Sequence, residues 1–358
     1  MIFVDSPESV RNFCKIFADD IAEASEENKF IAVDTEFIRE NLSIPLICLV
    51  QVATANTVFV IDPLAVDLAF LCSIFEDEKL PKVFHSGQQD IEILKIYGLD
   101  VNNICDTQLY EMLLSTRDRI SYLDIVKKYL DKNISKSYST SNWMHRPLNE
   151  KQLLYSAEDV LYLRDVYKKQ QESLRNSGRL HWLDGEIASF YKKNETSQIK
   201  EKKSTLFQQL FCWRSTKAME ISADAQSIAS DALLNKISKK GVPFIKVVQN
   251  SRWIINNTRR EFLQFAELLA QNMEITPTIS HKNISVHLLK AILEIKSAEN
   301  NVAISIIATT AELERLCNGY TDVKCLSGWR NEIFGKYAMS FLRGELAISM
   351  KNSNVVLK

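Results

Sequence analysis

Short apolar runs near the start of the chain, rich in β-branched residues, restrict its fold more than any other feature. Three of them, at 30–33, 46–53 and 57–61, lie close enough together in the sequence to pair as neighbouring strands. Helical patterns and short strand-like runs then alternate, with helices expected at 67–75 and 88–97 and strands at 82–84 and 103–105. This alternation predicts an α/β domain in which helices flank a mixed sheet.

Two longer amphipathic patterns, at 119–130 and 149–174, are expected to complete this domain as helices. Asn149 stands where an N-cap would open the second helix. The polar segment 132–141 between them is rich in Ser and Lys, and we expect an exposed loop of functional importance there.

The chain has 358 residues, which is enough for about two or three domains of ordinary size. A charge run at 192–203 contains little apolar sequence and is expected to be a linker. We therefore predict one domain at 1–191, followed by two small helical domains at 204–274 and 275–358. Their helices are expected to break at turns such as 240–243 (Lys-Gly-Val-Pro).

Composition excludes several classes of protein. Hydrophobic residues make up 46% of the chain and charged residues 25%, which is typical of a globular protein and not of a disordered one. No apolar run reaches the roughly 18 residues that a membrane span needs, and no signal peptide is expected. The seven cysteines are scattered without a C-x-x-C pair, which favours reduced thiols in the cytoplasm over a structural zinc. The five histidines are dispersed too, so a bound metal would need oxygen ligands.

Charge is distributed unevenly along the chain. The net charge is −1, but residues 1–170 contain 18 Lys and Arg against 27 Asp and Glu, and residues 171–358 contain 26 against 18. A basic half suits a polyanion such as nucleic acid, and an acidic half suits cation binding. Imbalances of this size are also common on solvated surfaces.

Asp34 and Glu36 directly follow the first strand-like run. Side chains two residues apart on a strand point to the same face, so both carboxylates could converge on a hard divalent cation. The same spacing recurs at Asp90/Glu92 and Asp184/Glu186. The spacing alone is therefore weak evidence, and the residues that follow decide its meaning.

Three further polar motifs follow in order along the chain. They are 85–90 (His-Ser-Gly-Gln-Gln-Asp) at a strand-to-helix turn, 106–108 (Asp-Thr-Gln) after another strand, and 155–159 (Tyr-Ser-Ala-Glu-Asp) on the last long helix. Tyr155 and Asp159 are four residues apart, so on a helix they share one face at about 6 Å.

With its acids in this order, the chain resembles the DEDD 3′→5′ exonuclease superfamily in its tyrosine-bearing branch, and within it the ribonuclease D family. The segments 105–108 (Cys-Asp-Thr-Gln) and 141–148 (Ser-Asn-Trp-Met-His-Arg-Pro-Leu) also match, and the resemblance covers nearly the full length. It implies an RNase H-like exonuclease domain followed by two small all-helical domains similar to the helicase and RNase D C-terminal (HRDC) domain.

The resemblance also implies five catalytic residues and two divalent metal ions, Mg²⁺ or Mn²⁺. Asp34 would bridge both ions, Glu36 and Asp159 would hold the ion that activates water, and Asp90 would act at the second ion. Tyr155 would orient the attacking water, because a phenol with a pKa near 10 is a poor base at neutral pH unless the metal ions depress that pKa.

Substrate contacts are expected from Phe37, Arg146 and Lys136, on the same resemblance. Phe37 would pack against the terminal base or ribose, or would serve equally well as a core aromatic at the strand end. Arg146 and Lys136 would contact phosphates. Arg119 and Lys132 are further phosphate candidates along the same path.

Other polar residues near these motifs are expected to have structural roles. Glu92, Glu158 and Asp106 are interpreted as helix-face, cap or supporting acids in preference to metal ligands. His85 is interpreted as a structural residue of its turn.

Two segments of the basic half resemble HRDC-type modules. These are 206–214, which matches the opening of an HRDC domain, and 328–335, which matches the second helical module of ribonuclease D. The chain departs from the HRDC pattern after 214, because the expected Arg- and Pro-containing segment is missing. Trp329 and Phe334 are expected to seal a helical core. Positive charge that could guide RNA is supplied by Arg252, Arg259, Arg260, Lys239 and Lys240.

These features together predict a metal-dependent 3′→5′ exoribonuclease that trims RNA ends, with tRNA precursors as substrates and nucleoside 5′-monophosphates as products. We expect a cytoplasmic monomer without a membrane partner. Two alternatives stay open: a 3′→5′ DNA exonuclease, and a non-catalytic RNA-binding scaffold.

Overall fold

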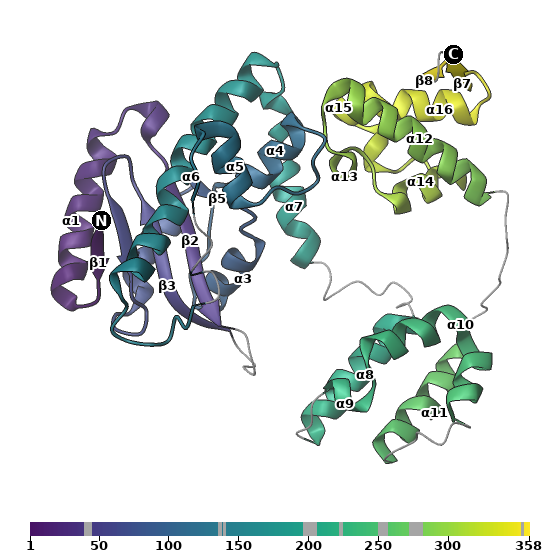
Figure 1. The fold of residues 1–358 in the computed structure, drawn as a ribbon, viewed down its shortest axis with the longest axis horizontal. Helices are drawn as coiled ribbons and strands as arrows, with labels where there is room; N and C mark the ends of the chain where they lie inside the picture. Colours follow the sequence, from purple (N-terminus) through teal and green to yellow (C-terminus); the bar gives the residue numbers. More distant parts are fainter. Residues whose placement is uncertain are drawn as a thin grey trace. The chain divides into compact units, whose positions relative to one another are not determined.

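The structure is a computed structural model. It describes residues 1–38, 45–134, 138, 141–195, 206–221, 225–249, 257–271, 282–351 and 354–358. The chain forms two compact units, and Figure 1 shows the elements of each. The larger unit combines residues 1–192 with 281–358, and the smaller unit consists of residues 193–280.

A six-stranded sheet organises the larger unit. Its strands are β1 (Ile2–Val4), β2 (Ile31–Ile38), β3 (Leu46–Ala53), β4 (Val58–Ile61), β5 (Lys82–Phe84) and β6 (Ile104–Asp106). They are arranged in the order β1-β4-β3-β2-β5-β6. β3 is antiparallel to both β2 and β4, whereas β1, β5 and β6 join by parallel pairing. The sheet is therefore mixed, and the predicted α/β fold is confirmed.

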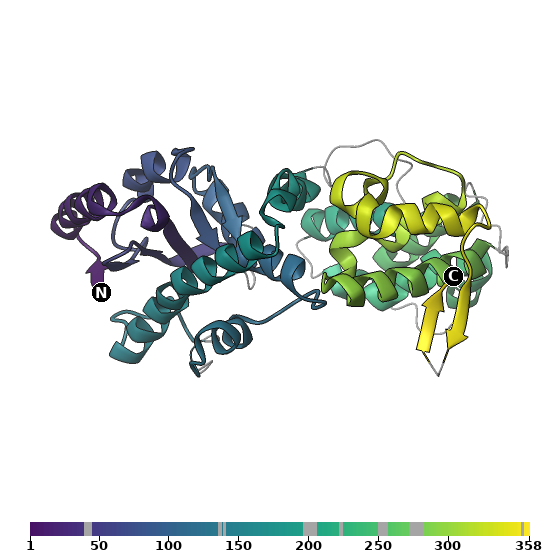
Figure 2. The ribbon, with the colours of Figure 1, turned by 90° about the horizontal axis from the view of Figure 1, so that it is seen from above.

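Helices cover both faces of this sheet. They are α1 (Pro7–Glu23), α2 (Cys72–Glu76), α3 (Gln88–Ile96), α4 (Thr107–Leu114), α5 (Tyr122–Leu130), α6 (Glu150–Asn176) and α7 (Glu186–Glu195). Side chains that alternate along the strands divide into two cores. Ile31 and Val33 pack in the α1 core, which also holds residues of α1 and α3, whereas Ala32 and Val60 pack in the α6 core with residues of α4 and α6. The long helix α6 packs across β2, β3, β4 and β5 (Figure 2).

β2 is longer than the sequence predicted. The apolar run was expected to end at Val33, but the strand continues to Ile38, so Asp34 and Glu36 lie inside it. The reason is that β3 pairs with β2 along this whole stretch, from Ala32 opposite Ala53 to Ile38 opposite Leu46. Backbone pairing with a neighbour therefore extends the strand through polar residues that end the apolar pattern.

Other boundaries follow from local capping. The helix predicted from residue 119 begins at Tyr122, because the Ser121 hydroxyl accepts a hydrogen bond from the Asp124 N–H at 3.2 Å. Asn149 caps α6 as predicted, accepting from the Gln152 N–H at 2.9 Å. The sequence patterns missed β1, α1 and α4. Seven of the eight residues of α4 are buried, so this helix lacks the polar face that an amphipathic pattern requires.

Short turns of other helical types complete the larger unit. They are the 3-10 turns Glu26–Asn28, Leu68–Leu71, Leu180–Leu183 and Lys324–Leu326, and the π-helical segment Asn331–Gly335. The first half of the predicted helix at 67–75 is one of these 3-10 turns, and α2 follows it directly.

The last segment of the chain belongs to the larger unit. Its elements are α12 (Lys282–Asn300), α13 (Ile304–Ile307), α14 (Thr310–Cys317), α15 (Gly328–Arg330), α16 (Lys336–Leu342), β7 (Ile348–Lys351) and β8 (Asn354–Leu357). The segment is helical, as predicted, up to the two-stranded sheet that ends it. Its buried residues join the α6 core, and Trp329 and Phe334 are buried there as expected.

A buried ion pair joins this last segment to α7. The Arg330 guanidinium makes two hydrogen bonds to the Glu186 carboxylate, one of 2.6 Å between Nη2 and Oε2. Lys324 Nζ lies 3.0 Å from the same carboxylate. Beside the pair, the rings of Trp182 and Trp329 stack at 4.6 Å between centroids. These contacts hold the last segment within the larger unit.

The smaller unit is a set of helices around its own apolar core. They are α8 (Leu206–Glu220), α9 (Ala225–Ile228), α10 (Asp231–Gln249) and α11 (Asn257–Gln271). The break predicted at 240–243 is wrong, because α10 runs through these residues. Ile237 and Ile245 are both fully buried, one on each side of that stretch, so packing holds the helix across it.

The predicted domain boundaries are only partly within the described residues. The linker prediction of 192–203 begins inside α7, and its remainder from 196 lies outside the described residues. The boundary predicted between 274 and 275 also lies outside them. The division into three domains stays a prediction. Within the described part of the chain, no helix is both long and apolar enough to cross a membrane.

Removal of the buried ion pair is expected to destabilise the larger unit. Arg330→Met would leave the Glu186 carboxylate buried with Lys324 as its remaining cation, and we expect a loss of about 3 kcal/mol in the free energy of unfolding, measured by urea denaturation. Arg343→Met is the matched control, because it removes an exposed pair with Glu345 and should leave stability unchanged. Equal effects of the two substitutions would contradict the structural role of the buried pair.

Candidate active site

Alternation along β2 carries its two acids to one face of the sheet. Val33 packs in the α1 core and Ala32 in the α6 core, so Asp34 and Glu36 point toward α6. Asp159 lies on α6 and meets them there. Oxygen atoms of the three carboxylates lie within 4.8 Å of one another, which is close enough to hold one metal ion together.

Asp90 lies in the first turn of α3, beside Thr35 of β2. Thr35 lies between the two acids and its hydroxyl donates a hydrogen bond to Asp90 Oδ1. β5 pairs with β2 only at Ile31 and Ala32, and α3 begins shortly after β5 ends, so the first turn of α3 lies near Thr35. Asp90 is not one of the three acids whose oxygen atoms lie within 4.8 Å of one another, but its charge contributes to raising the pKa of Asp34.

The turn before α3 is held by Asp106. This carboxylate is fully buried and accepts four hydrogen bonds, from the N–H groups of Ser86 (3.0 Å), Gly87 (3.1 Å) and Gln108 (2.8 Å) and from the Tyr191 hydroxyl (2.6 Å). It therefore fixes the start of α3 and caps α4 at once. The predicted role of Asp106 as a cap is confirmed.

His85 has a structural position in the same turn. Its Nε2 donates to the Ile120 carbonyl at 3.1 Å, and its Nδ1 lies 2.9 Å from the Thr107 hydroxyl oxygen. Burial lowers the pKa of His85, so the ring is neutral at physiological pH. Both ring nitrogen atoms are used within the protein, which supports the structural role that the sequence suggested.

Tyr155 lies on α6 four residues, about one turn, before Asp159. The rings of Trp143 and Tyr138 lie 6.0 Å and 6.3 Å from the Tyr155 ring, between centroids. Burial, and then the charge of Asp159, raise the pKa of Tyr155 above its usual value. The phenol therefore keeps its proton at neutral pH, which suits a group that orients water and not one that removes a proton.

Burial and clustering strongly disfavour the ionised form of these carboxyl groups. Burial is the largest cause for each of them, and neighbouring acids add to it for Asp34 and Glu36. The pKa of Glu36 is raised to about 9, that of Asp159 to about 7 and that of Asp90 to about 6, while that of Asp34 is raised well above its usual value. A divalent cation would favour the charged forms, and an all-carboxylate donor set suits a hard ion such as Mg²⁺ or Mn²⁺.

The structure supports no substrate contact for Phe37 and does not describe Lys136. Phe37 packs against the α1 core, on the face opposite Asp34 and Glu36, which supports its alternative role as a core aromatic. Lys136 lies outside the described residues. The contacts of Phe37 and Lys136 with a substrate stay predictions.

The Arg146 guanidinium makes all its hydrogen bonds within the protein. Its Nε and Nη2 bind the Asp62 carboxylate at 2.5 Å and 2.7 Å, and Nη2 also donates to the Cys48 carbonyl at 2.9 Å. Nη1 donates to the carbonyls of Trp143 and His145 at 2.6 Å and 3.1 Å. All five N–H groups of the guanidinium are used in these contacts. These contacts support a structural role for Arg146, and its contact with phosphate stays a prediction.

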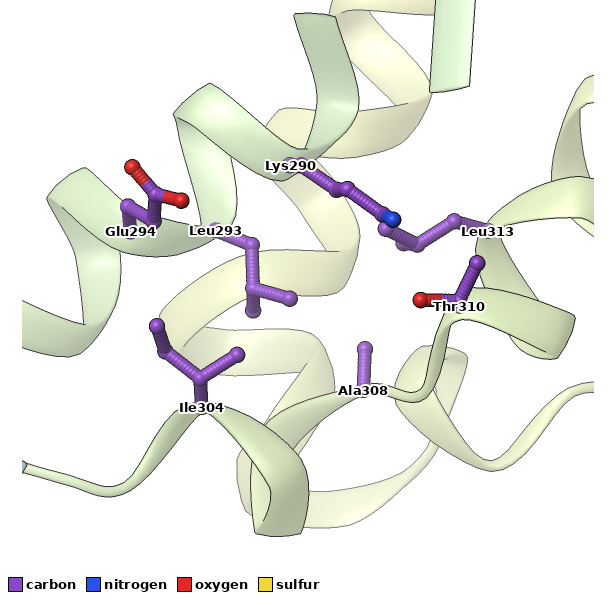
Figure 3. A pocket seen from close by; sticks show the side chains of 7 residues that line it. All are labelled: Lys290, Leu293, Glu294, Ile304, Ala308, Thr310 and Leu313. Atoms are coloured by element: carbon purple, nitrogen blue, oxygen red, sulfur yellow. The ribbon is translucent and has the colours of Figure 1, made fainter. Parts of the chain in front are cut away.

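A separate cavity of about 220 Å³ lies in the last segment of the chain, away from these acids in the sequence. Leu293, Ile304 and Leu313 form an apolar lining, and Lys290 extends over it toward the side of Thr310 (Figure 3). None of the predicted site residues lines this cavity.

Comparisons with known proteins agree with this geometry. A family described as 3′-5′ exonuclease matches residues 12–175. Ribonuclease D of Bartonella henselae is 32% identical, covering 95% of this chain and 91% of that protein, and ribonuclease D of Jannaschia sp. is 30% identical, covering 91% and 93%. The crystal structure of Escherichia coli RNase D, described as an exoribonuclease involved in structured RNA processing, matches with a TM-score of 0.69 and 20% identity over 96% of this chain and 98% of that one. At that identity the structural likeness shows a shared fold.

Arg146→Gln should weaken the fold without weakening phosphate binding. The substitution leaves the Asp62 carboxylate, which is 4% exposed, without its cation, and we expect the free energy of unfolding to fall by about 2 kcal/mol or more. The salt dependence of nucleic-acid binding should stay unchanged, whereas loss of a phosphate contact would reduce its slope by about 1. A reduced slope with unchanged stability would instead support Arg146 as a phosphate contact.

The raised pKa values predict how pH affects the metal-free protein. Glu36, Asp90 and Asp159 bind protons more tightly in the fold than in the unfolded chain, where their pKa values lie near 4. Their contribution to stability is complete below about pH 4 and is lost as the pH rises through about 6 to 9. Urea denaturation of EDTA-treated protein at several pH values should show this loss. Glu36→Gln cannot ionise and should lose less stability over the same range. A loss equal to that of the unsubstituted protein would contradict the shift at Glu36.

Proposed function

The chain belongs to the ribonuclease D family of 3′–5′ exoribonucleases, and we propose that it removes nucleotides from RNA 3′ ends by a two-metal mechanism. The observation that carries this proposal is the convergence of Asp34, Glu36 and Asp159, with oxygen atoms within 4.8 Å of one another and Asp90 beside them. Clustered carboxyls that resist ionisation in a protein without metal fit a site for divalent cations.

Each acid has a proposed task at this site. Asp34 would bridge two ions, Glu36 and Asp159 would hold one of them, and Asp90 would serve the other. Two divalent ions supply a nucleophile at neutral pH, an in-line alignment and stabilisation of charge on the leaving oxygen. Thr35 would hold Asp90 beside β2 through the hydrogen bond between their side chains.

Tyr155 has a positioning task in this proposal. Its hydroxyl group keeps its proton at neutral pH, because burial and the charge of Asp159 raise its pKa. A protonated phenol can both donate to and accept from a water molecule, so Tyr155 can orient the attacking water beside the ligands of the metal ion. The rings of Trp143 and Tyr138 limit the movement of this side chain.

The substrate and product are proposed from the relatives and from charge. Each cleavage would release a nucleoside 5′-monophosphate. RNA is favoured because the relatives are named as ribonucleases, and structured RNA because the Escherichia coli relative is described as processing it. Precursors of tRNA fit this description. The basic second half of the chain, with its HRDC-like segments, supplies positive charge for the RNA backbone. The predicted cytoplasmic, monomeric state stays a prediction.

Substitution of Asp34 tests the mechanism. With Mg²⁺ or Mn²⁺, 5′-labelled single-stranded RNA should shorten in a ladder from the 3′ end, and 3′-labelled RNA should release its label first as a mononucleotide. Asp34→Asn should reduce the rate by about a thousandfold or more. Asp184→Asn is the matched control, because Asp184 begins another acid pair of the same spacing but is exposed, and it should retain activity.

Two results would overturn parts of this proposal. Stepwise shortening that survives Asp34→Asn would refute the assigned mechanism. DNA of the same sequence shortened as fast as RNA would refute the RNA assignment. A protein that binds RNA but shortens no strand with either metal ion would favour the non-catalytic scaffold.

A further inference from the structure

Gln51 is a buried glutamine whose side-chain amide has no hydrogen-bond partner in the described part of the chain. The residue lies in β3, and its relative exposure is 0%. Neither its Nε2 nor its Oε1 has a hydrogen-bond partner among the described residues. Burying an amide without hydrogen-bond partners costs free energy. A group that binds to the amide in the working protein would remove this cost.

The strand register places Gln51 next to the acids. Gln51 lies directly opposite Asp34 in the antiparallel pair of β3 with β2. Val50 and Val52 pack in the α1 core, so Gln51 points to the α6 face, as Asp34 does. The Cβ atoms of directly opposed residues lie about 4.5 to 5.5 Å apart, which is within reach of a glutamine side chain.

Other buried glutamines of the described chain differ in this respect. Gln108 accepts the Ile120 N–H at 2.9 Å, and Gln170 donates to the Thr107 carbonyl at 3.0 Å. Each therefore has a structural partner for part of its amide. Gln51 has no such partner among the described residues; it lies opposite Val60 on β4 and opposite Asp34, an acid of the candidate metal site, on β2.

We propose that Gln51 is a positioning residue of the metal site, whose amide N–H donates a hydrogen bond to the Asp34 carboxylate when that carboxylate holds divalent metal ions. The inference rests on the proposed function. Carboxylates that ligate metal ions are themselves held by hydrogen bonds from surrounding groups, and these groups orient them. A neutral amide supplies such a bond without adding a further negative charge to four acids.

Gln51→Met tests this role, because methionine has a similar length but no N–H donor. We expect the affinity for Mn²⁺, measured by isothermal titration calorimetry, to fall by about 10- to 100-fold. The metal-free protein should be as stable as before or more stable, because an unpartnered polar group has been replaced by an apolar one. Opposite directions for metal affinity and metal-free stability separate a positioning role from a structural one.

Gln170→Met is the matched control. It removes a buried glutamine amide that lies eleven residues beyond Asp159 on the same helix and donates to the Thr107 carbonyl. This substitution should lower the stability of the metal-free protein and leave the affinity for Mn²⁺ unchanged.

The outcomes distinguish this inference from the proposed function. If the unsubstituted protein fails to bind Mn²⁺, both are overturned. If it binds Mn²⁺ and Gln51→Met binds it equally well, only the role of Gln51 is overturned. A Gln51→Met protein that is less stable without metal, or that fails to fold, would instead assign Gln51 a structural role.

Discussion

The antiparallel pairing of β2 with β3 determines where Asp34 and Glu36, the first two acids of the site, lie. Because the two strands pair from Ala32 to Ile38, the alternation of side chains holds through the polar residues, and Asp34 and Glu36 reach the same face. The register shift between Glu36 and Phe37 follows immediately after them. A slip of one residue in this pairing would turn both acids into the α1 core and Thr35 toward α6. The catalytic geometry therefore depends on strand register before it depends on any side-chain contact.

The elements around β2 bring the remaining acids close to this strand. β5 is short, so α3 can begin beside the middle of β2 and present Asp90 to Thr35. Asp106 holds the turn that precedes α3, and its own burial is balanced by four hydrogen bonds. On the other side, α6 lies across four strands, and Arg164 fastens it by donating to the carbonyls of Phe30 and Asn28. Asp106 and Arg164, which are not among the four acids, thus hold α3 and α6 in place through hydrogen bonds to backbone groups.

Much of this arrangement could be predicted from the sequence, and the failures have identifiable causes. The alternating strand and helix patterns predicted the α/β fold, and the resemblance to a known family pointed to Asp34, Glu36 and Asp159, which the structure brings together. The continuation of β2 beyond Val33 was missed because it is imposed by β3 and not by the local apolar pattern. α4 was missed because it is buried on nearly every side. The position of Arg146 suggested a phosphate contact, and only the structure reveals Asp62, a residue 84 positions away, as its partner.

None of the charged neighbours that shift the pKa values of the four acids is a cation, so cations from solution would have to neutralise the ionised acids. The neighbouring charges that shift the pKa values of Asp34, Glu36, Asp90 and Asp159 all come from other acids. Arg146 and Arg164 lie on nearby elements, but their guanidinium groups bind Asp62 and backbone carbonyls. Asp90 accepts a hydrogen bond from the hydroxyl of Thr35, which is a neutral group. An anionic phosphodiester would therefore be repelled by the ionised cluster, and binding of divalent cations would remove that repulsion. Metal binding and substrate binding should consequently be thermodynamically coupled, each increasing the affinity for the other.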